Sequence, residues 1–450
     1  MNIRNLIIII LFGYTLINFN TSAFAATIYA ASANYNDVFT AVSSASVGDT
    51  VVVPAGRVTW PSNLIITKGI ILKGAGIGNT VITGGASGYI ITYSPTDTSS
   101  NNAFRLTGFT FITTTSGGFK LYKSGLTTPQ TRIRIDHNRF EGTKMVAEVY
   151  SPFYGVADNN QIVNTASGHM DNYGLNAITW GNTKDPFTFG SINNFYWEDN
   201  VVTTSDGFCS GGLGGRYVYR YNTWNWTAGV GLYSAFDMHG NQDGGNYATM
   251  GAEIYGNKII AGSHNGNLVD LRGGQLLAYF NYISSTGSSF EGGRVRDEYD
   301  DSLYPERNSF LQHPNNSYFW NNRRNGTDLL KAIETQDCCN SIAENSEFWN
   351  HNPAYNGTTE RGIYCGASLP ATCTVGDGAW ITSQSCAFLS TAHVGANPNT
   401  PISGTLYKCT STNKWTAYYT PLPYPHPLRT EDDAHDIRSP MNLRIISSQY

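Results

Sequence analysis

The stretch Phe195-Tyr-Trp-Glu-Asp-Asn200 returns 22 residues later as Tyr217-Val-Tyr-Arg-Tyr-Asn222. Both copies are short runs of strand-forming aromatic and β-branched residues that end in Asn. Related runs elsewhere in the chain end in Asn138, Asn160, Asn257, Asn281 and Asn322, so that successive copies lie between 22 and 41 residues apart. The shorter intervals suit one coil of three strands, and the longer ones add a loop or a second coil, as solenoids allow.

The repeat predicts a structural role for the Asn that closes each copy. Asn tolerates the left-handed backbone angles of a tight turn. Stacked in register, its side-chain amides can hydrogen-bond from coil to coil. Towards the N-terminus, residues 48–82 contain strand-sized apolar runs such as Leu64-Ile-Ile66, separated by Gly, Asn, Ser or Pro with no room for crossover helices. Parallel strands joined without helices must coil, so we expect an all-β parallel β-helix.

The ends of the chain carry the features of an exported solenoid. A basic start at Met1–Arg4, an apolar run at Leu6–Ile17 and small residues at Ser22–Ala25 predict a signal peptide over residues 1–25. The apolar run is too short to span a membrane comfortably, so we expect a secreted or periplasmic protein without a membrane span. After it, Asn36-Asp37 can cap a helix, and this helix would cover the open end of the first coil. Its apolar face would consist of Tyr35, Val38, Phe39 and Val42.

The cysteines are concentrated in the last quarter of the sequence. Six of the seven are Cys338, Cys339, Cys365, Cys373, Cys386 and Cys409. In an exported protein they predict up to three disulfides with open pairing, zinc being the less favoured alternative. The lone Cys209 is expected to be a buried small apolar side chain. We expect residues 336–450 to form a disulfide-linked cap, with a hairpin followed by a Pro-rich extended strap.

The amino-acid composition limits the classes of ligand that the protein is expected to bind. Charged residues are 14% of the chain, against about 25% in ordinary globular proteins. The net charge of −5 gives no reason to expect nucleic-acid binding, which would want a basic surface. A polyanionic substrate would instead need a local basic site on what we expect to be a monomer.

Several segments resemble the pectate-lyase-like right-handed parallel β-helix superfamily. They are Gly48–Gly56, residues 66–82, Phe104–Phe111 and the repeated coils that end in Asn. The resemblance covers roughly residues 36–335 and implies a right-handed solenoid over residues 26–335. That superfamily includes lyases, hydrolases, esterases, phage tailspikes and adhesins, so the function must be sought in a site.

The best candidate site comes from two segments that align residue for residue. Asp237-Met-His239 and Asp270-Leu-Arg272 lie at an offset of 33 residues. Because alternate strand residues share a face, stacking would place Asp237 over Asp270 and His239 over Arg272. Arg294 and Arg296 would extend the same stripe.

Such a stripe suits cleavage of a uronate polysaccharide by β-elimination, which needs a base and positive charge beside the substrate carboxylate. By resemblance to the family, Arg272 or Arg296 would be the base and an Asp-held Ca²⁺ would bind the carboxylate. His239 is better matched to neutral pH by its ordinary pKa. Asp237 and Asp270, two neighbouring carboxylates, are the calcium candidates. Substrate-binding candidates are Arg294, Trp224 and Trp226.

Three alternatives stay open. The stripe could be a structural ion-pair ladder in which Asp237 bonds to Arg272 across coils. The chain could be a non-catalytic carbohydrate-binding or surface protein that uses its aromatic residues, although coil packing is the favoured role for these. They are Trp180, Phe195, Tyr196, Trp197, Tyr217, Tyr219, Tyr221, Trp224 and Trp226. It could also be a glycoside hydrolase of the tailspike or polygalacturonase kind, with carboxylates from Asp199, Asp206, Asp237 and Asp270.

Overall fold

The architecture is known from a computed structural model. It describes residues 25–164, 170–205, 207, 209–227, 234–241, 247–298, 312–335, 342–387 and 392–430. Residues 1–24 of the predicted signal peptide, Cys338, Cys339 and Asp206 lie outside these residues. None of the helices in the described part of the chain has the length and apolar run that a membrane crossing requires.

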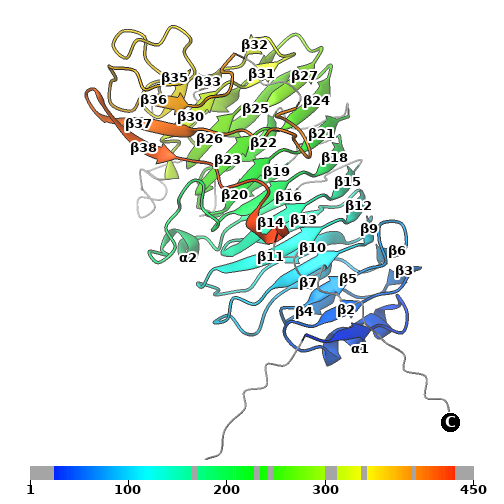
Figure 1. Ribbon diagram of the computed structural model, residues 1–450. Coiled ribbons are helices and arrows are strands. Elements are labelled where there is room, and N and C mark those ends of the chain that lie inside the picture. Colours follow the sequence, from blue (N-terminus) through cyan, green and yellow to red (C-terminus); the bar gives the residue numbers. More distant parts are fainter. Residues whose placement is uncertain are drawn as a thin grey trace, which may run out of the picture.

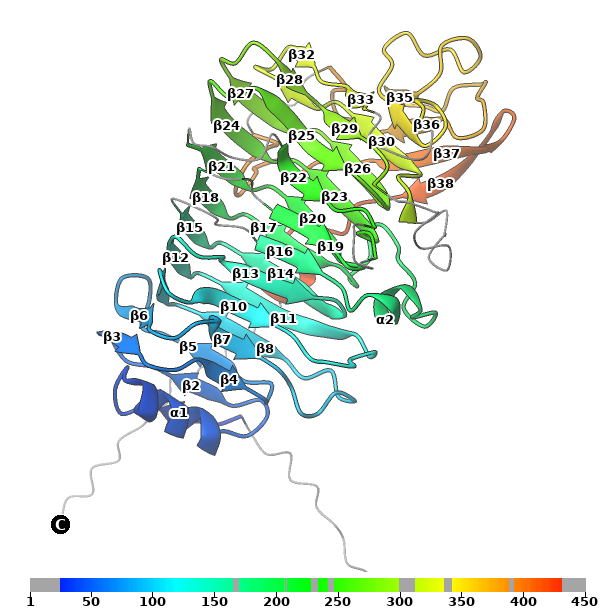
Figure 2. The same cartoon turned by 180° about the vertical axis from the view of Figure 1, so that it is seen from behind.

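Three long sheets, here named A, B and C, run the length of the molecule (Figures 1 and 2). Sheet A consists of β1 (Thr27–Tyr29), β2 (Thr50–Val52), β5 (Ile71–Lys73), β8 (Phe104–Thr107), β11 (Gln130–Asp136), β14 (Phe153–Asp158), β17 (Phe195–Glu198), β20 (Arg216–Arg220), β23 (Gly251–Tyr255), β26 (Gln275–Tyr279), β30 (Ser317–Trp320) and β34 (Phe348–Asn350). Sheet B consists of β3 (Gly56–Trp60), β6 (Thr80–Gly84), β9 (Thr110–Thr113), β12 (Arg139–Gly142), β15 (Gln161–Asn164), β18 (Val201–Thr204), β21 (Thr223–Trp226), β24 (Lys258–Gly262), β27 (Tyr282–Ser285), β31 (Arg323–Arg324) and β32 (Asp328–Leu329). Sheet C consists of β4 (Leu64–Ile66), β7 (Tyr89–Tyr93), β10 (Gly117–Leu121), β13 (Ala147–Tyr150), β16 (Met170–Tyr173), β19 (Cys209–Gly212), β22 (Ser234–Met238), β25 (Gly266–Leu271), β28 (Phe290–Glu291), β29 (Gly293–Val295) and β33 (Ala332–Glu334).

Each coil contributes one strand to sheet A, then one to sheet B, then one to sheet C, before the next coil begins. Strands of successive coils pair in parallel, as β17 with β20 and β22 with β25. The final pair of sheet B, β31 with β32, is antiparallel. The expected right-handed parallel β-helix is therefore confirmed.

The predicted asparagine ladder runs through the interior beside sheet A. From Asn160 onward, each Asn accepts, at its side-chain oxygen, the backbone N–H and the amide N–H of the ladder Asn one coil earlier, as Asn222 does from Asn200 at 3.0 and 2.9 Å. The ladder is continuous through Asn138, Asn160, Asn200, Asn222, Asn257, Asn281 and Asn322. These buried amides fix the register of the coils, because each missing partner would leave a polar group unsatisfied in the core.

The predicted N-terminal helix is present as α1 (Tyr35–Ser44) and lies over the first coils (Figure 1). Its N-cap is Asn34, so the expectation that Asn36 and Asp37 cap it is wrong. Asp37 instead lies in the first turn, where it accepts a hydrogen bond from Ser32. Phe39 is 49% exposed rather than part of the buried face, which comprises Val38, Ala41 and Val42.

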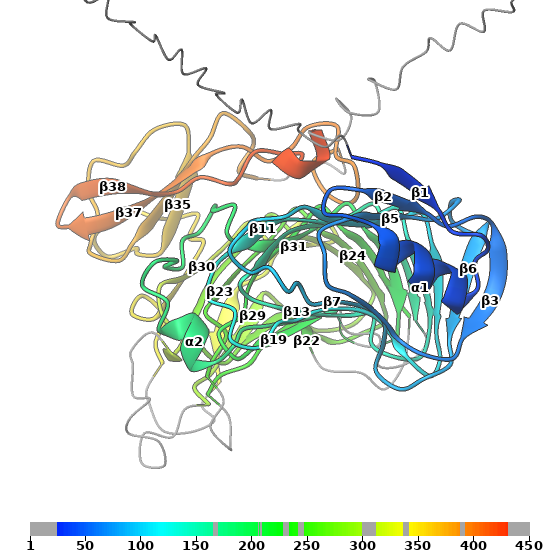
Figure 3. The same cartoon turned by 90° about the horizontal axis from the view of Figure 1, so that it is seen from below.

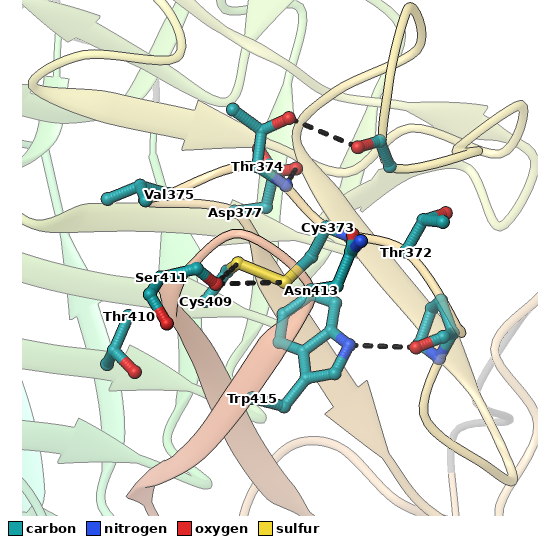
Figure 4. The surroundings of a disulfide bond; sticks show 12 residues. Thr372, Cys373, Thr374, Val375, Asp377, Cys409, Thr410, Ser411, Asn413 and Trp415 are labelled. Atoms are coloured by element: carbon teal, nitrogen blue, oxygen red, sulfur yellow. Dashed lines mark hydrogen bonds between the residues drawn. A yellow bond between two sulfur atoms is a disulfide. The ribbon is translucent and has the colours of Figure 1, made fainter.

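A small fourth sheet, sheet D, covers part of sheet A near the C-terminus. It consists of β35 (Ile363–Gly366), β36 (Gly378–Ile381), β37 (Thr405–Ser411) and β38 (Lys414–Tyr419). The expected hairpin is the antiparallel pair β37–β38. Two of the expected disulfides are formed, Cys365–Cys386 and Cys373–Cys409, and the latter ties β37 to the segment that contains Thr372 and Thr374 (Figure 4). Disulfides are typical of proteins that fold in an oxidising compartment. Cys209 is buried and unbonded, as predicted.

The Pro-rich segment after β38, residues 420–430, forms a strap across the outer face of sheet A. Figure 3 shows this strap and sheet D on the side of sheet A, away from the strands of sheet C. Arg220 donates hydrogen bonds to the backbone carbonyls of Leu422 and Pro423 at 2.6 and 3.0 Å. The strap thus covers charged side chains on the outer face of sheet A. The candidate site lies on the outer face of sheet C.

Candidate functional site

The outer face of sheet C carries two rows of polar side chains that the register aligns along the solenoid. Asp237 pairs with Asp270, and Asp270 pairs with Arg294, as predicted from the two aligned segments. Residues two positions further along each strand form the second row, in which His239 and Arg272 are in direct contact. The core residues Met238 and Leu271 between the two rows point inward, so strand alternation places both rows on the outside.

Arg272 is the centre of the cluster and is 6% exposed. Its Nη2 lies 2.7 and 2.6 Å from the two carboxylate oxygens of Asp237, and its Nη1 lies 2.5 Å from Oε1 of Glu298. Its Nη2 also lies 2.6 Å from Nδ1 of His239. The Asp237–Arg272 bond across coils is the contact that the structural alternative predicted.

The electrostatics of the cluster oppose a base role for Arg272. Burial lowers the pKa of its guanidinium, but the charges of Asp237 and Glu298 outweigh burial and raise that pKa above its ordinary value. A group held as a cation cannot accept a proton. It can, however, stabilise negative charge that develops nearby.

His239 is better placed for proton transfer. A guanidinium nitrogen only donates, so the Nδ1 that faces Arg272 at 2.6 Å must accept and carry no proton. The side chain is 29% exposed, which leaves it accessible to a ligand. In the neutral imidazole the proton is then on Nε2, so His239 can accept a substrate proton only at Nδ1 and only when Nδ1 is released from Arg272. Arg272 is a fixed positive charge.

Arg296 and Arg294 complete the charged end of the two rows. Arg296 is bidentate to Asp270, with Nε–Oδ1 at 3.1 Å and Nη2–Oδ2 at 2.8 Å. Its side chain is 18% exposed. Arg294 is half-buried and has no ion-pair partner within the described part of the chain, where the next residue in its row is Ile333. Arg294 is thus the cation best able to bind an external carboxylate.

The two predicted calcium ligands do not fit that ion. Both oxygens of Asp237 accept hydrogen bonds from Arg272, and both oxygens of Asp270 accept them from Arg296. A calcium ion bound there would lie beside two guanidinium groups that already neutralise the carboxylates. Among the described residues, no cluster of three or more His, Cys, Asp or Glu side chains could hold a metal.

The predicted substrate-binding tryptophans lie elsewhere, and this expectation is corrected. Trp224 and Trp226 are on β21 of sheet B, and they are only 1% and 4% exposed. Their rings stack on each other, with centroids 4.8 Å apart, inside the coil. Most other aromatic residues of the set are also interior or covered packing residues, namely Phe195, Tyr196, Trp197, Tyr217, Tyr219 and Tyr221.

Asp206 of the hydrolase alternative lies outside the described residues, and the other three carboxylates do not form one site. Asp199 follows β17 of sheet A, where it accepts hydrogen bonds from Tyr424 and Arg429 of the strap. Asp237 and Asp270 belong to sheet C. Asp199 is therefore separated from the pair by the body of the solenoid.

Sequence reasoning missed the continuation of both rows towards the N-terminus. The second row runs on through Tyr173, Tyr150 and Tyr122, whose neighbouring ring centroids are 5.4 and 4.9 Å apart. In the first row, Lys120 lies 2.7 Å from Glu148 and about equally close to the rings of Tyr122 and Tyr150, at 5.1 and 5.0 Å from their centroids.

A signal for this continuation exists in the sequence. The triplets Lys120-Leu-Tyr122, Glu148-Val-Tyr150, Asp171-Asn-Tyr173 and Ser210-Gly-Gly212 stack in register with Asp237-Met-His239. Extending the overlay of Asp237 and Asp270 by four coils would have revealed it. Glu298, which pairs with Arg272, was not among the predicted site residues.

Comparison of this chain with solved structures finds the following matches. An alginate lyase from Paenibacillus sp. str. FPU-7 matches with 14% identity over 70% of this chain and 99% of its own, at a TM-score of 0.36. The A-module of a mannuronan C-5 epimerase from Azotobacter vinelandii matches with 14% identity over 68% and 93%, at a TM-score of 0.28. A protein of Geobacillus virus E2 matches with 10% identity over 85% and 72%, at a TM-score of 0.38. No protein-family model and no curated protein matches the sequence.

Proposed function

We propose that this chain is an exported protein that binds an acidic polysaccharide along the outer face of sheet C and cleaves it by β-elimination. The observation that carries the proposal is the second outer row of that sheet. From Tyr122 to Arg296 it offers aromatic rings, then an imidazole, then guanidinium groups, all on one side of the solenoid. Sugar rings pack on aromatic faces, and uronate carboxylates pair with arginine.

In this proposal Nδ1 of His239 is released from Arg272 when substrate binds and removes the proton from the carbon beside the uronate carboxylate. The electron pair left behind forms a double bond as the adjacent carbon–oxygen glycosidic bond breaks, and the leaving oxygen takes up a proton from the imidazolium that this step forms. Arg294 binds the substrate carboxylate, while Arg272 and Arg296 stabilise the negative charge that develops on it. No metal is needed for this balance, because the positive charge comes from arginine side chains.

A second candidate is a binding protein without catalysis. This candidate is favoured because the guanidinium of Arg272 already contacts Asp237, Glu298 and His239 within the protein. A preformed ion-pair network of this kind can hold a flat outer face rigid for ligand binding. The two candidates share the polymer and the surface, and they differ only in whether a bond breaks.

The decisive test is ultraviolet absorbance of unsaturated products from pectate, alginate and other acidic polymers, measured with calcium and with a chelator. We expect absorbance to rise in both conditions for the wild-type protein. His239→Gln should lower the rate by roughly 10²–10⁴-fold with unchanged polymer binding. A rise that occurs only with calcium would contradict the arginine-based assignment.

A matched control separates the site from the fold. Thr203→Gln changes an outward side chain on sheet B and should leave both activity and binding unchanged. Polymer binding without unsaturated products or new reducing ends would support the binding protein instead. Absence of binding to every acidic polymer would overturn both candidates.

A further inference from the structure

The strap covers only part of the outer face of sheet A. Its last described residues lie over β14, where Nε of Arg429 is 3.3 Å from Oδ2 of Asp158 (Figure 1). The outer rows of sheet A continue from there through β11 onto β8, β5, β2 and β1. Tyr196 under the strap is fully buried, whereas Tyr29 at the far end of sheet A is 74% exposed. Among the described segments, none covers the outer face of these first four strands.

The outer face of these four strands contains a hollow of about 510 Å³, here named the sheet A hollow. Pockets that bind small molecules have volumes of about 300–1,000 Å³. The lining side chains are Thr27, Tyr29, Thr50, Val52, Ile71, Lys73, Arg105 and Thr107. They combine an aromatic ring, two cations, three hydroxyl groups and two aliphatic side chains. This is the set of groups that recognises a sugar bearing a carboxylate.

Positive charge is in excess around the sheet A hollow. Lys73 is exposed, and an adjoining hollow of about 60 Å³ is lined by the exposed Arg132 together with Arg105. Neither Lys73 nor Arg132 has an ion-pair partner in the described part of the chain. Arg105 is bidentate to the buried Asp136, with both distances 2.8 Å, and keeps 22% of its side-chain surface exposed. The chain as a whole has a net charge of −5, so this local excess attracts anions to one end of sheet A.

Tyr29 supplies an aromatic surface beside these cations. It is the most exposed large apolar side chain among the described residues. Tyr29 pairs with Val52, and Val52 pairs with Lys73 on the next strand. The phenol ring and the ammonium group therefore belong to one row, two strands or roughly 10 Å apart at their backbones. A sugar ring stacked on Tyr29 brings its carboxylate towards the flexible side chain of Lys73.

We propose that the sheet A hollow is a second binding site for the acidic polysaccharide, in which a sugar ring stacks on Tyr29 and a uronate carboxylate pairs with Lys73 and Arg105. The choice of polymer rests on the proposed function, and the site goes beyond it because it lies on another face of the solenoid. The lining offers no carboxylate or imidazole to act as a base, so the polymer is held here and not cleaved. With one site on each face, the protein attaches to one chain of a polymer matrix while it acts on another.

The test is acetylation of lysine side chains in the full-length mature protein, measured residue by residue by mass spectrometry with and without tetramers of galacturonate or mannuronate. A bound carboxylate protects Lys73, so its acetylation rate should fall by the factor 1 + [L]/Kd, about tenfold at ten times Kd. Lys120 in the first row of sheet C reports on the candidate site in the same spectra. Lys414, which is exposed on β38, is the control and should not be protected.

Two aromatic variants make the test specific to the ring. Tyr29→Ala should raise the oligosaccharide concentration that half-protects Lys73 by about tenfold, equivalent to about 1.4 kcal/mol. The unfolding midpoint should not change, because the ring is mostly in solvent. Phe39→Ala on α1, which removes another half-exposed ring outside the hollow, is the matched control and should protect Lys73 like the wild type. Equal half-protection in Tyr29→Ala and the wild type would overturn the stacking on Tyr29.

The outcomes separate the second site from the proposed function. Protection of Lys120 without protection of Lys73 would overturn the second site alone. Protection of Lys73 alone would support the second site and contradict binding along sheet C. Protection of neither, or equal protection of Lys414, would overturn both.

The chain also contains an acidic segment directly after the strap, Glu431-Asp-Asp433, which could compete for the same cations. A variant with the three residues replaced by Gln, Asn and Asn tests this alternative. Protection of Lys73 in both the variant and the wild type would support the polysaccharide as the ligand. Protection that appears only in the variant would overturn that assignment and identify the acidic segment as the occupant.

Discussion

Sheet A and sheet C both carry charged rows on their outer faces, but the two rows lie in opposite environments. On sheet A, Glu198 and Arg220 are fully buried, because the strap lies across them and Arg429 joins their network. On sheet C, His239 and Arg296 keep 29% and 18% of their side-chain surface exposed. The same register rule therefore builds a buried network where the strap covers the row and a partly exposed cluster on sheet C.

The charged side chains of the covered row on sheet A pair with one another and with Arg429 of the strap. Glu198 contacts Arg220 and Arg429 and accepts the backbone N–H of His426 at 3.1 Å. Burial raises the pKa of this carboxyl, but the two arginines outweigh burial and lower it below its ordinary value. The row on sheet C also pairs most of its charges, yet Arg294 has no ion pair within the described residues. The difference predicts that substitutions in the covered row of sheet A act on stability and those on sheet C act on binding.

The largest effect should come from Arg220→Ala on sheet A. The substitution removes a buried cation and leaves the carbonyls of Leu422 and Pro423 without their donor. We expect the free energy of unfolding to fall by about 3–5 kcal/mol, as measured by urea denaturation. Arg139→Ala, which breaks a partly exposed pair with Glu141, is the control and should cost about 0–1 kcal/mol. Similar costs for both variants would contradict the strap's structural role.

The next effect is a pH dependence at Glu253, also on the covered face. This carboxylate accepts hydrogen bonds from the Gly190 N–H and the Tyr419 hydroxyl, and burial raises its pKa to about 7 from an ordinary value of 4.5. The folded state therefore holds the proton more tightly. Its stabilising effect is complete below about pH 4.5 and is lost as the pH rises to about 7.

Glu253→Gln should abolish this dependence, because the amide stays neutral at every pH. Relative to the wild type, the variant should gain stability on the order of 3 kcal/mol between pH 5 and pH 8. Urea denaturation of both proteins at the two pH values measures the difference. Parallel stability curves for the two proteins would show that Glu253 does not titrate in this range.

The stability cost of Arg272→Ala on sheet C can be compared directly with that of Arg220→Ala on sheet A. Both arginines bridge carboxylates across coils, but Asp237 keeps 11% of its side-chain surface exposed and can regain water. We therefore expect a stability cost of only about 1–2 kcal/mol, together with loss of product formation in the ultraviolet assay. Loss of folding together with activity would instead identify the cluster as a structural ladder.

The smallest stability effect is expected for Arg294→Gln, since this side chain has no ion pair in the described part of the chain. The free energy of unfolding should change by less than about 0.5 kcal/mol, while polyuronate binding weakens. The weakening should be greatest at low salt, because an exposed charge is screened as ionic strength rises. Arg294→Lys should retain most of the binding, and unchanged affinity of the Gln variant would remove Arg294 from the site.

The coil and the stacking of its strands could be predicted from the amino-acid sequence alone. The asparagine ladder was predictable because the turn preference of Asn and the alternation of strand residues are local properties that repeat along the chain. The pairing of Asp237 with Asp270 followed from the same periodicity. The burial of Cys209 and two disulfides in the C-terminal part were also predictable, since cysteine behaviour follows from compartment and surroundings.

Which outer face is covered could not be predicted from the sequence, because it depends on tertiary contacts. Arg429 lies 230 residues after Asp199, and no local pattern links the strap to sheet A rather than to sheet B or sheet C. The partners of Arg272 could not be predicted from a local pattern either. Glu298, which contacts Arg272, lies on a coil whose register is set by packing. Trp224 and Trp226 were misassigned to the surface because an aromatic residue suits a core and a sugar platform equally well. Burial is a property of the whole assembly of coils, strap and cap, and it depends on contacts between residues far apart in the chain.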